Sequence, residues 1–341
     1  MSKKDLLAKA LSKLRLLPLA IKAHGYFTNS ITILAYHRIY DMGDEKTFPF
    51  DPELISATTA EFKLQMQYVK KHFNPVTFND LIEFQNGNKA LPKRPIIITF
   101  DDGHLDNYTQ AYPILDSLSI PATIFLSTNY IGSNKIFWFD WVAYCIYRTT
   151  EKSLSINNND FEIAIGSDVS TRRSNATQLL IYLMSIDNES RLMCIEEINQ
   201  KLKVCLLNED KEKSAVLNWE QVTEMLDNNI EFGSHTVSHP ILSKLNIESL
   251  KAELSESKKE IESKLNINVD IIAYPAGGKN QFNNSVIDEC KKAGYKLGIS
   301  YISGTESIIH YNSFLIKRLH VERYTNLDFF KSMLAFPSIF K

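Results

Sequence analysis

The chain contains 341 residues, of which 44% are hydrophobic and 23% charged, and its formal net charge is −2. This length suits one barrel with an insertion or two small domains, and the composition is that of an ordinary soluble globular protein. A net charge so close to zero gives no indication of a nucleic-acid partner. Four scattered cysteines suit a reducing compartment better than a disulfide scaffold.

Residues 1–30 are predicted to form a basic amphipathic segment. Leucines recur at roughly helical spacing, and lysines and an arginine lie between them. No apolar stretch reaches the ~20 residues of a transmembrane helix, and we expect no secretory leader because no apolar core precedes a small-residue cleavage site. Residues 1–25 therefore form either a helix packed on the barrel or a basic helix on the inner face of a membrane. We expect a cytoplasmic protein, either free or peripherally bound to that face.

From residue 31 onward, apolar strands alternate with amphipathic helices, which predicts a parallel α/β sheet. We expect strands at 96–100, 121–127, 230–232, 297–300 and 314–321, with another beginning at 271. We expect helices at 61–72, 77–85, 108–118, 218–228, 247–265, 286–294 and 327–334. Residues of about 132–216 break this rhythm and are rich in Asn, Ser, Lys and Glu. They are predicted to be a largely helical insertion over the mouth of the barrel.

Residues 96–103 read Ile-Ile-Ile-Thr-Phe-Asp-Asp-Gly, a buried strand that ends in Asp101 and Asp102. Ionised carboxylates are costly there unless a metal, a proton or a base partner compensates them. The carboxyl end of a parallel strand is also where α/β folds carry their chemistry. The alternative is that both aspartates only cap the next segment.

A second polar cluster, residues 233–240, follows the strand expected at 230–232 and contains His235 and His239. Their spacing predicts a helical turn with both imidazoles on one side, where both can bind one metal ion. One carboxylate and two histidines make a metal site with open positions for water and substrate. The second carboxylate is then free to act as a general base.

Thr99–Gly103 and His235–His239 resemble the first two motifs of the polysaccharide deacetylase family, also known as the NodB homology domain or carbohydrate esterase family 4. The resemblance implies a distorted (β/α)7 barrel of the NodB-homology type over residues 31–341, with Asp101 as the catalytic base. It also implies a divalent metal, most often Zn²⁺ with Co²⁺ or Ni²⁺ as alternatives, held by Asp102, His235 and His239.

Residues 271–278 resemble the third motif of this family, although on its own the segment is only a strand entering a Pro-Gly turn. The resemblance implies that this segment lines the substrate groove and supplies a backbone amide to the oxyanion; its residues are Tyr274, Pro275, Ala276 and Gly277. Ala273 stands where many members have the arginine that orients the base.

Arg318 is our candidate for that orienting cation, because arginine binds carboxylates bidentately and stays charged when buried. His320 is the candidate general acid. It resembles the family's last motif, Leu-x-His, although Arg318 stands in place of the leucine. Strand alternation puts both side chains on the same face, either towards the site or away from it.

Two other segments can reach the site. His37 follows a segment that resembles the family's first barrel strand, and we interpret it as a structural histidine at the edge of the pocket. The aromatic residues 137–141 are by default part of the core. Alternatively, Trp138 stacks on a sugar ring, and Asp140 contacts a sugar hydroxyl or the base-orienting arginine.

The resemblance implies metal-dependent removal of an N-acetyl group from a GlcNAc-like sugar, in a polysaccharide or a lipid-linked glycan of the cell envelope. An O-acetyl esterase of a surface polysaccharide and a catalytically impaired carbohydrate-binding barrel are the alternatives. A two-metal phosphoesterase needs more ligands than this single triad. The two adjacent aspartates favour an enzyme, because a binding module has no use for a base beside a metal.

Overall fold

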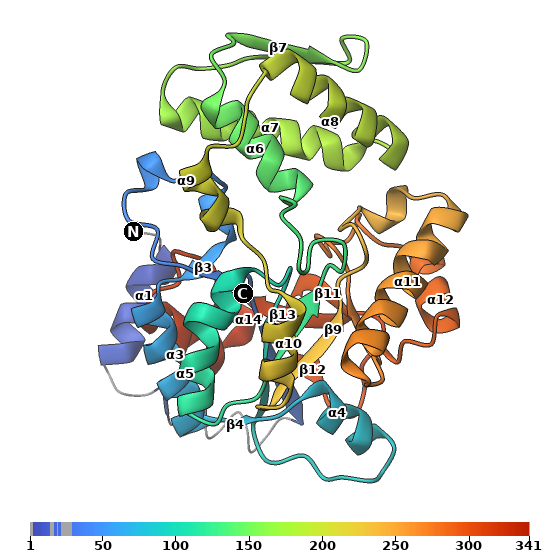
Figure 1. The fold of residues 1–341 in the computed structure, drawn as a ribbon. Coiled ribbons are helices and arrows are strands. Elements are labelled where there is room, and N and C mark those ends of the chain that lie inside the picture. Colours follow the sequence, from blue (N-terminus) through green and yellow to red (C-terminus); the bar gives the residue numbers. More distant parts are fainter. Residues whose placement is uncertain (1–2, 14–16, 19, 22–28, 341) are drawn as a thin grey trace.

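The structure is a computed structural model, which describes residues 3–13, 17–18, 20–21 and 29–340. Seven parallel strands close into a barrel in the order β1-β13-β11-β10-β9-β6-β5, since β1 pairs with both β13 and β5 (Figure 1). Their bounds are Ser30–Tyr36 (β1), Pro95–Phe100 (β5), Ala122–Leu126 (β6), Ile230–Ser234 (β9), Ile271–Ala273 (β10), Leu297–Ser303 (β11) and Ile316–His320 (β13). The predicted (β/α)7 barrel is confirmed.

Helices cover the outside of the barrel (Figure 1). They are α3 (Thr59–His72), α4 (Phe78–Gln85), α5 (Tyr112–Ser117), α10 (Trp219–Leu226), α11 (Ile247–Leu265), α12 (Asn284–Lys292) and α13 (Leu327–Ala335). Side chains fix several of their starts. Thr58, for example, accepts from the Glu61 amide, and the Glu61 carboxylate accepts from the Thr58 amide in return. The helix expected over 108–118 is present, and its first part is π-helical: residues 107–111 form a π-helix that leads directly into α5.

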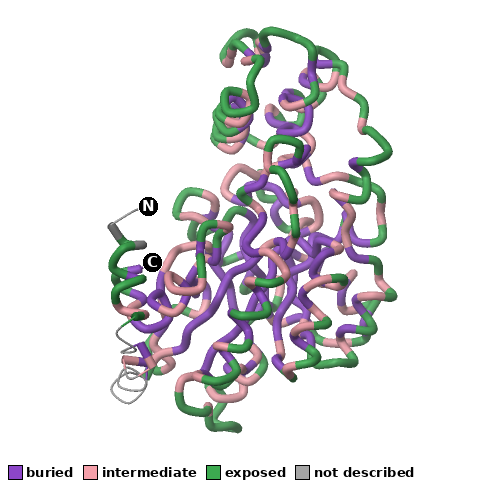
Figure 2. Tube along the Cα trace, turned by 90° about the vertical axis from the view of Figure 1, so that its left-hand side faces the viewer, coloured by how far each residue is buried: buried purple, intermediate pink, exposed green. Residues whose placement is uncertain are grey.

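Successive residues of each barrel strand point to opposite faces, and the two faces contact different cores. In β5, Ile96 and Ile98 pack with the outer helices, whereas Ile97 belongs to the cluster inside the barrel. Figure 2 shows the buried strands at the centre of the molecule. In β13, Ile316 also belongs to the inner cluster. This alternation therefore aims Asp101 and Arg318 at the inside of the barrel.

An insertion between β6 and β9 forms a separate layer above the barrel (Figure 1). It contains α6 (Trp138–Arg148), β7 (Ser153–Ile156), β8 (Phe161–Ala164), α7 (Val169–Ser185), α8 (Asn188–Leu202) and α9 (Asn208–Lys211). A cluster of buried residues from α6, α7 and α8 gives it a small core of its own. The layer is mostly helical, as expected, with an antiparallel β7–β8 hairpin at its far side.

The N-terminal helix α1 (Lys3–Lys13) packs against α13, with Ala8 buried and the Ser12 hydroxyl donating to the Asp328 carboxylate. Leu6 and Leu7 stay exposed. For its described residues, the prediction of a helix packed on the barrel is confirmed. Contact with a membrane stays a prediction, and residues 14–16, 19 and 22–28 lie outside the described part. Across the described ranges, no helix has the length and apolarity needed to cross a membrane.

Candidate active site

The chain turns sharply at the end of β5, where Asp102 has φ = 77° and Gly103 has φ = 81°. A left-handed conformation is uncommon for aspartate, and such residues concentrate at functional sites. A Cβ atom at Gly103 would lie 3.0 Å from side-chain carbons of Ile131 and Leu126, so glycine fits this turn best. The turn lets the two adjacent carboxylates face different partners.

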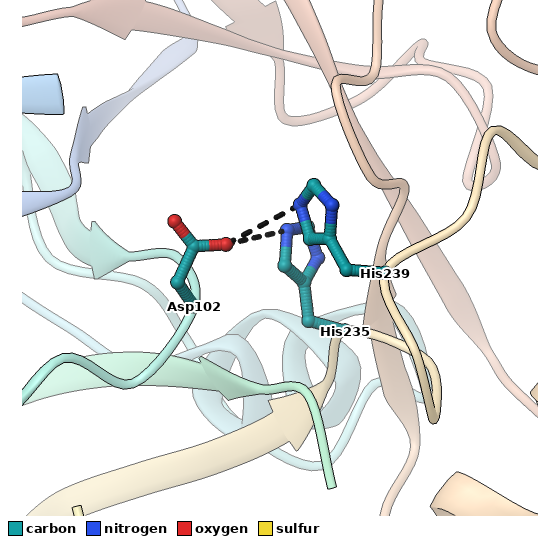
Figure 3. A group of neighbouring side chains, drawn as sticks. All are labelled: Asp102, His235 and His239. Atoms are coloured by element: carbon teal, nitrogen blue, oxygen red, sulfur yellow. Dashed lines mark ion pairs between the residues drawn. The ribbon is translucent and has the colours of Figure 1, made fainter. Parts of the chain in front are cut away.

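Asp102, His235 and His239 meet at the carboxyl ends of β5 and β9 (Figure 3). Oδ1 of Asp102 lies 3.5 Å from Nε2 of His235 and 3.3 Å from Nε2 of His239, and all three residues are buried. One ligand atom from each residue lies within 4.8 Å of the others.

The chemistry of these donors fits a divalent metal ion. Oδ1 of Asp102 is buried and has no hydrogen-bond partner, so a cation would satisfy it. Nδ1 of His235 hydrogen bonds with the Ala273 carbonyl at 2.8 Å, which leaves Nε2 as the ligand atom. Burial lowers the pKa of His235 to about 4, so this imidazole is neutral and able to ligate at neutral pH. One carboxylate and two imidazoles suit Zn²⁺ and neighbouring transition metals.

The prediction of a helical turn at the two histidines is wrong. β9 ends at Ser234, and the following loop brings His239 back towards His235 through positive φ angles at Thr236 (69°) and His239 (55°). Glu253 of α11 anchors this loop, because its carboxylate accepts from the amides of Val237 and Ser238 at 2.8 and 2.9 Å. Loop conformation, rather than helical periodicity, therefore places the two imidazoles together.

Asp101 forms a bidentate ion pair with Arg318 of β13. Both N–H···O distances are 2.7 Å, and Arg318 also donates to the Ser300 carbonyl and to the Thr99 hydroxyl at 3.0 Å each. Burial raises the pKa of the Asp101 carboxyl, but the Arg318 guanidinium and its hydrogen bonds outweigh that effect and lower the pKa below its usual value. Asp101 is thus a buried carboxylate that stays ionised at neutral pH.

His37 also lines the site, at the end of β1. Its Nε2 lies 3.9 Å from Oδ2 of Asp101, and its side chain is 18% exposed. Burial lowers the pKa of His37, although the Asp101 charge opposes the shift. A neutral imidazole therefore stands beside the carboxylate, on the inward face that strand alternation gives to odd-numbered residues of β1.

A cavity of about 280 Å³ contains Asp101, His37 and the Asp-His-His triad. Most of its remaining wall is apolar, made by Leu54, Trp138, Phe139, Leu180, Met184 and Ile241. Leu180 and Met184 belong to α7, so the insertion forms part of this wall. Sequence reasoning missed both, because amphipathic spacing in a helix does not tell which neighbour the apolar face covers.

Trp138 and Asp140 lie in different surroundings although both belong to the first turn of α6. Trp138 lines the cavity, and its indole N–H donates to the His239 carbonyl at 2.9 Å. Asp140 is 1% exposed and does not line the cavity, and neither carboxylate oxygen has a partner. Burial raises its pKa to about 6. The expected contact with the base-orienting arginine is not found, since Arg318 binds Asp101, Thr99 and Ser300 instead.

Only Ala276 of the third-motif residues lines the cavity. Tyr274 points the other way: it stacks on Phe282 and donates its hydroxyl to the Phe314 carbonyl at 3.1 Å. Strand alternation explains this, because Ala273 faces the barrel interior and Tyr274 therefore faces the outer helices. Pro275 and Gly277 are buried in the turn. A Cβ atom at Gly277 would lie 2.6 Å from the Tyr301 amide nitrogen.

His320 lies behind the cavity wall and does not line it. Its ring stacks on Tyr301 with centroids 3.7 Å apart, and Tyr301 lines the cavity. Burial lowers the pKa of His320 to about 3, so the ring is neutral at neutral pH and cannot donate a proton as an imidazolium. This position does not favour the general-acid role expected from the sequence.

His104 is a site residue that sequence reasoning missed. It directly follows Gly103, is completely buried, and places Nε2 3.5 Å from Oδ2 of Asp102, the carboxylate oxygen that faces away from the two histidines. Phe137 packs against its ring. The sequence did contain a signal for His104, because it stands two positions after Asp102 and must therefore lie close to that carboxylate.

Comparison with known proteins agrees with this geometry. The family model for polysaccharide deacetylases matches residues 88–298 of the chain. The chain belongs to the polysaccharide deacetylase family. Every residue of the Asp101 and Asp102 pair and of the two-histidine loop lies inside the matched range.

Several curated relatives of this deacetylase-family chain have the name poly-β-1,6-N-acetyl-D-glucosamine N-deacetylase. The Staphylococcus epidermidis protein is 36% identical over 115 residues, which are 32% of this chain and 39% of the relative. The Staphylococcus aureus protein is 29% identical over 125 residues, 35% of this chain and 43% of the relative. The matches thus span less than half the length of either relative.

Solved structures of other proteins share the fold. The Streptococcus pyogenes deacetylase PplD, solved in complex with acetate, superposes with a TM-score of 0.58 at 21% identity and covers 87% of this chain and 94% of its own. IcaB from Ammonifex degensii gives a TM-score of 0.54 at 15% identity, over 90% of this chain and 96% of its own.

Proposed function

We propose that this protein is a metal-dependent deacetylase that removes the N-acetyl group of a GlcNAc-like residue in a polysaccharide or lipid-linked glycan. One observation carries the proposal: an ionised carboxylate, Asp101, held by Arg318, shares a cavity with the Asp102, His235 and His239 triad. A carboxylate beside a metal site is the arrangement that water activation needs.

Asp102, His235 and His239 would hold the metal, for which we propose Zn²⁺. When bound, it supplies a Lewis acid that polarises the acetamide carbonyl and lowers the pKa of a water molecule. His235 contributes a neutral imidazole through Nε2, because its Nδ1 is engaged with the Ala273 carbonyl. His104 faces the other oxygen of Asp102 and supports the orientation of that carboxylate.

Asp101 acts as the general base. Arg318 keeps it ionised and fixes the plane of its carboxylate, so that an oxygen is ready to accept the proton of the attacking water. The same carboxyl, once protonated, can return that proton to the leaving amine, and His37 lies beside it. Ala276 lines the cavity, and its backbone amide is our candidate for stabilising negative charge on the carbonyl oxygen. The products are acetate and a free amino sugar.

The apolar wall of the cavity supports an acetylated sugar as the substrate. Trp138 and Phe139 add aromatic surface that can contact a sugar ring, and Leu180 and Met184 add apolar surface that can contact the acetyl methyl group. The names of the curated relatives support N-acetyl over O-acetyl groups. The buried ion pair of Asp101 and Arg318 supports an active enzyme over a binding module. Burying two charges costs desolvation free energy, and a binding module has no need of an ionised base.

The test is metal reconstitution. Protein stripped with a chelator is assayed for acetate release from chitotetraose and from lipid-linked GlcNAc, before and after addition of stoichiometric Zn²⁺. We expect release only with metal, and none from a His235→Ala variant, which loses one ligand. Release that is equal with and without metal, or acetate from an O-acetylated glycan alone, would overturn this assignment.

A further inference from the structure

A second cavity, of about 460 Å³, lies where the insertion meets the barrel. We call it the basic cavity, because five of the residues that line it are cationic and one, Glu209, is acidic: the cations are Lys46, Arg148, Arg172, Arg173 and Lys213. The cations come from the 46–49 segment of the barrel and from α6, α7 and the segment after α9 in the insertion. None of these residues lines the active-site cavity.

Existing carboxylates neutralise only part of this charge. Asp210 alone serves two of the cations, accepting from Arg148 at 2.6 Å and from Lys213 at 2.9 Å. Arg172 donates instead to the carbonyls of Ile146, Tyr147 and Thr149 at the end of α6, at 2.8 to 3.1 Å. Carbonyl groups orient that guanidinium but leave its charge uncompensated. The basic cavity therefore keeps a positive excess.

Arg173 is the feature that points to a ligand. Its guanidinium lies over the Tyr147 ring, 5.2 Å from the centroid, and donates once to the Glu45 carbonyl. Its Nε and Nη1 atoms are buried and have no hydrogen-bond partner. Buried donors without partners cost free energy, and a bound oxyanion would satisfy both. The Glu45 carboxylate compensates this charge only in part: its Oε1 lies 3.7 Å from Nε of Arg173, beyond hydrogen-bond distance, and its Oε2 pairs with Arg323 at 2.6 Å.

Two segments of the chain contribute residues to both the basic cavity and the active-site cavity. Residues 46–49 line the first, and residues 51, 53 and 54 of the same segment line the second. On α7, Arg173 lines the first and Leu180 the second, seven residues later on the same face of the helix, which is a distance of ~10 Å. A glycan with its acetamide in the active site is long enough to place a substituent in the basic cavity.

We propose that the basic cavity binds a phosphate group carried by the glycan substrate. A guanidinium fork matches two oxygens of a tetrahedral anion, and lysine adds a point charge. The inference rests on the proposed function, because the phosphate would belong to the same substrate as the acetamide. It adds a substrate class, namely phosphate-bearing acetylated glycans, that the metal centre alone does not define.

Binding of the anion is measured first, by titration calorimetry of the full-length protein with inorganic phosphate and pyrophosphate at low salt. We expect Lys46→Gln to weaken binding by roughly 2- to 5-fold and Glu209→Gln to strengthen it by a similar factor, as charge changes at exposed positions do. Lys259→Gln, an exposed lysine on α11, is the matched control and should leave binding unchanged. Opposite effects of the two cavity variants exclude a folding defect as the cause.

A second arm asks whether the phosphate belongs to the substrate. KM is compared for chitotetraose and a phosphate-substituted chitotetraose, and we expect a lower KM for the phosphate-substituted glycan. Lys46→Gln should make the difference between the two KM values smaller, and Lys259→Gln should leave it unchanged. Phosphate binding without any KM advantage means a site for free phosphate and overturns the inference. Deacetylation without phosphate binding overturns it too, but leaves the proposed function intact. Phosphate binding without deacetylation of any glycan overturns the proposed function and, with it, the assignment of the phosphate to the substrate.

Discussion

Arg318 holds Asp101 through two parallel hydrogen bonds of 2.7 Å, although 217 residues separate them in the chain. Both side chains face the barrel interior, and β1 lies between their strands. The ion pair keeps Asp101 ionised, because a carboxylate buried in an apolar barrel without a cation would take up a proton and could no longer act as a base.

Replacement of Arg318 by methionine should change the pH dependence of catalysis. Burial raises the pKa of Asp101, and Arg318 is the main group that opposes this effect. In Arg318→Met the pKa therefore rises, and the acid limb of the kcat/KM profile should move to higher pH, with a loss of about 100-fold at neutral pH. Arg94→Met is the control. An acid limb at the same pH in the variant and the native protein would contradict the role of Arg318.

The buried Asp140 carboxyl should destabilise the fold as pH rises. Its pKa in the folded protein is raised from 3.8 to about 6, so the folded state holds a proton that the unfolded state has released. Its stabilising contribution is present below the unfolded pKa and is lost as pH rises through about 6, a change of about 3 kcal/mol. Urea unfolding measured from acid to neutral pH should show that the free energy of unfolding of Asp140→Asn increases relative to that of the native protein as pH rises. Parallel stability curves would refute this.

His104 should contribute to metal affinity without being a ligand. Its Nε2 faces the Asp102 oxygen opposite the two histidines, and such supporting contacts are typically worth 10- to 100-fold in affinity, or about 1–3 kcal/mol. Calorimetric titration of metal-free protein with Zn²⁺ should show this loss in His104→Phe. His104→Gln keeps a donor nitrogen at similar reach and should retain most of the affinity. Equal affinities for the Phe variant and the native protein would disprove the contribution.

The insertion should act on substrate binding. Leu180→Ser with Met184→Ser removes the apolar side chains that α7 contributes to the active-site cavity, and we expect KM to rise about 10-fold with kcat little changed. Ile181→Ser is the matched control, because Ile181 lies on the same helix and is 58% exposed. If the control raises KM equally, or the double variant leaves KM unchanged, α7 does not line the substrate site.

Local pattern was enough to predict the barrel strands and the Asp101 and Asp102 pair, but it left open whether Arg318 faces the site or points away from it. The apolar composition of residues 96–100 predicts a buried strand. Alternation then fixes the direction of each side chain once the strand is placed in the barrel. The same rule applied to Tyr274 would have turned it towards the outer helices. Its assignment to the groove came from the motif and not from the geometry.

Features that depend on loops and on tertiary packing were beyond sequence reasoning. The positive φ angles of Thr236 and His239 carry no signal in the sequence, so the histidine pair was placed on a helical turn. His320 shares the inward face of Arg318, but a stacked Tyr301 from the neighbouring strand separates it from the cavity. The basic cavity joins residues 46 to 213, and only the folded chain brings them together.

The most direct test of the central claim is acetate release by Asp101→Asn, measured beside its metal content. The substitution keeps the shape of the side chain but removes the base, so we expect turnover to fall by about 10²- to 10⁴-fold while one Zn²⁺ per chain is still bound through Asp102, His235 and His239. Full turnover with normal metal content would show that Asp101 is not the base. It would contradict the mechanism that we derive from its pairing with Arg318.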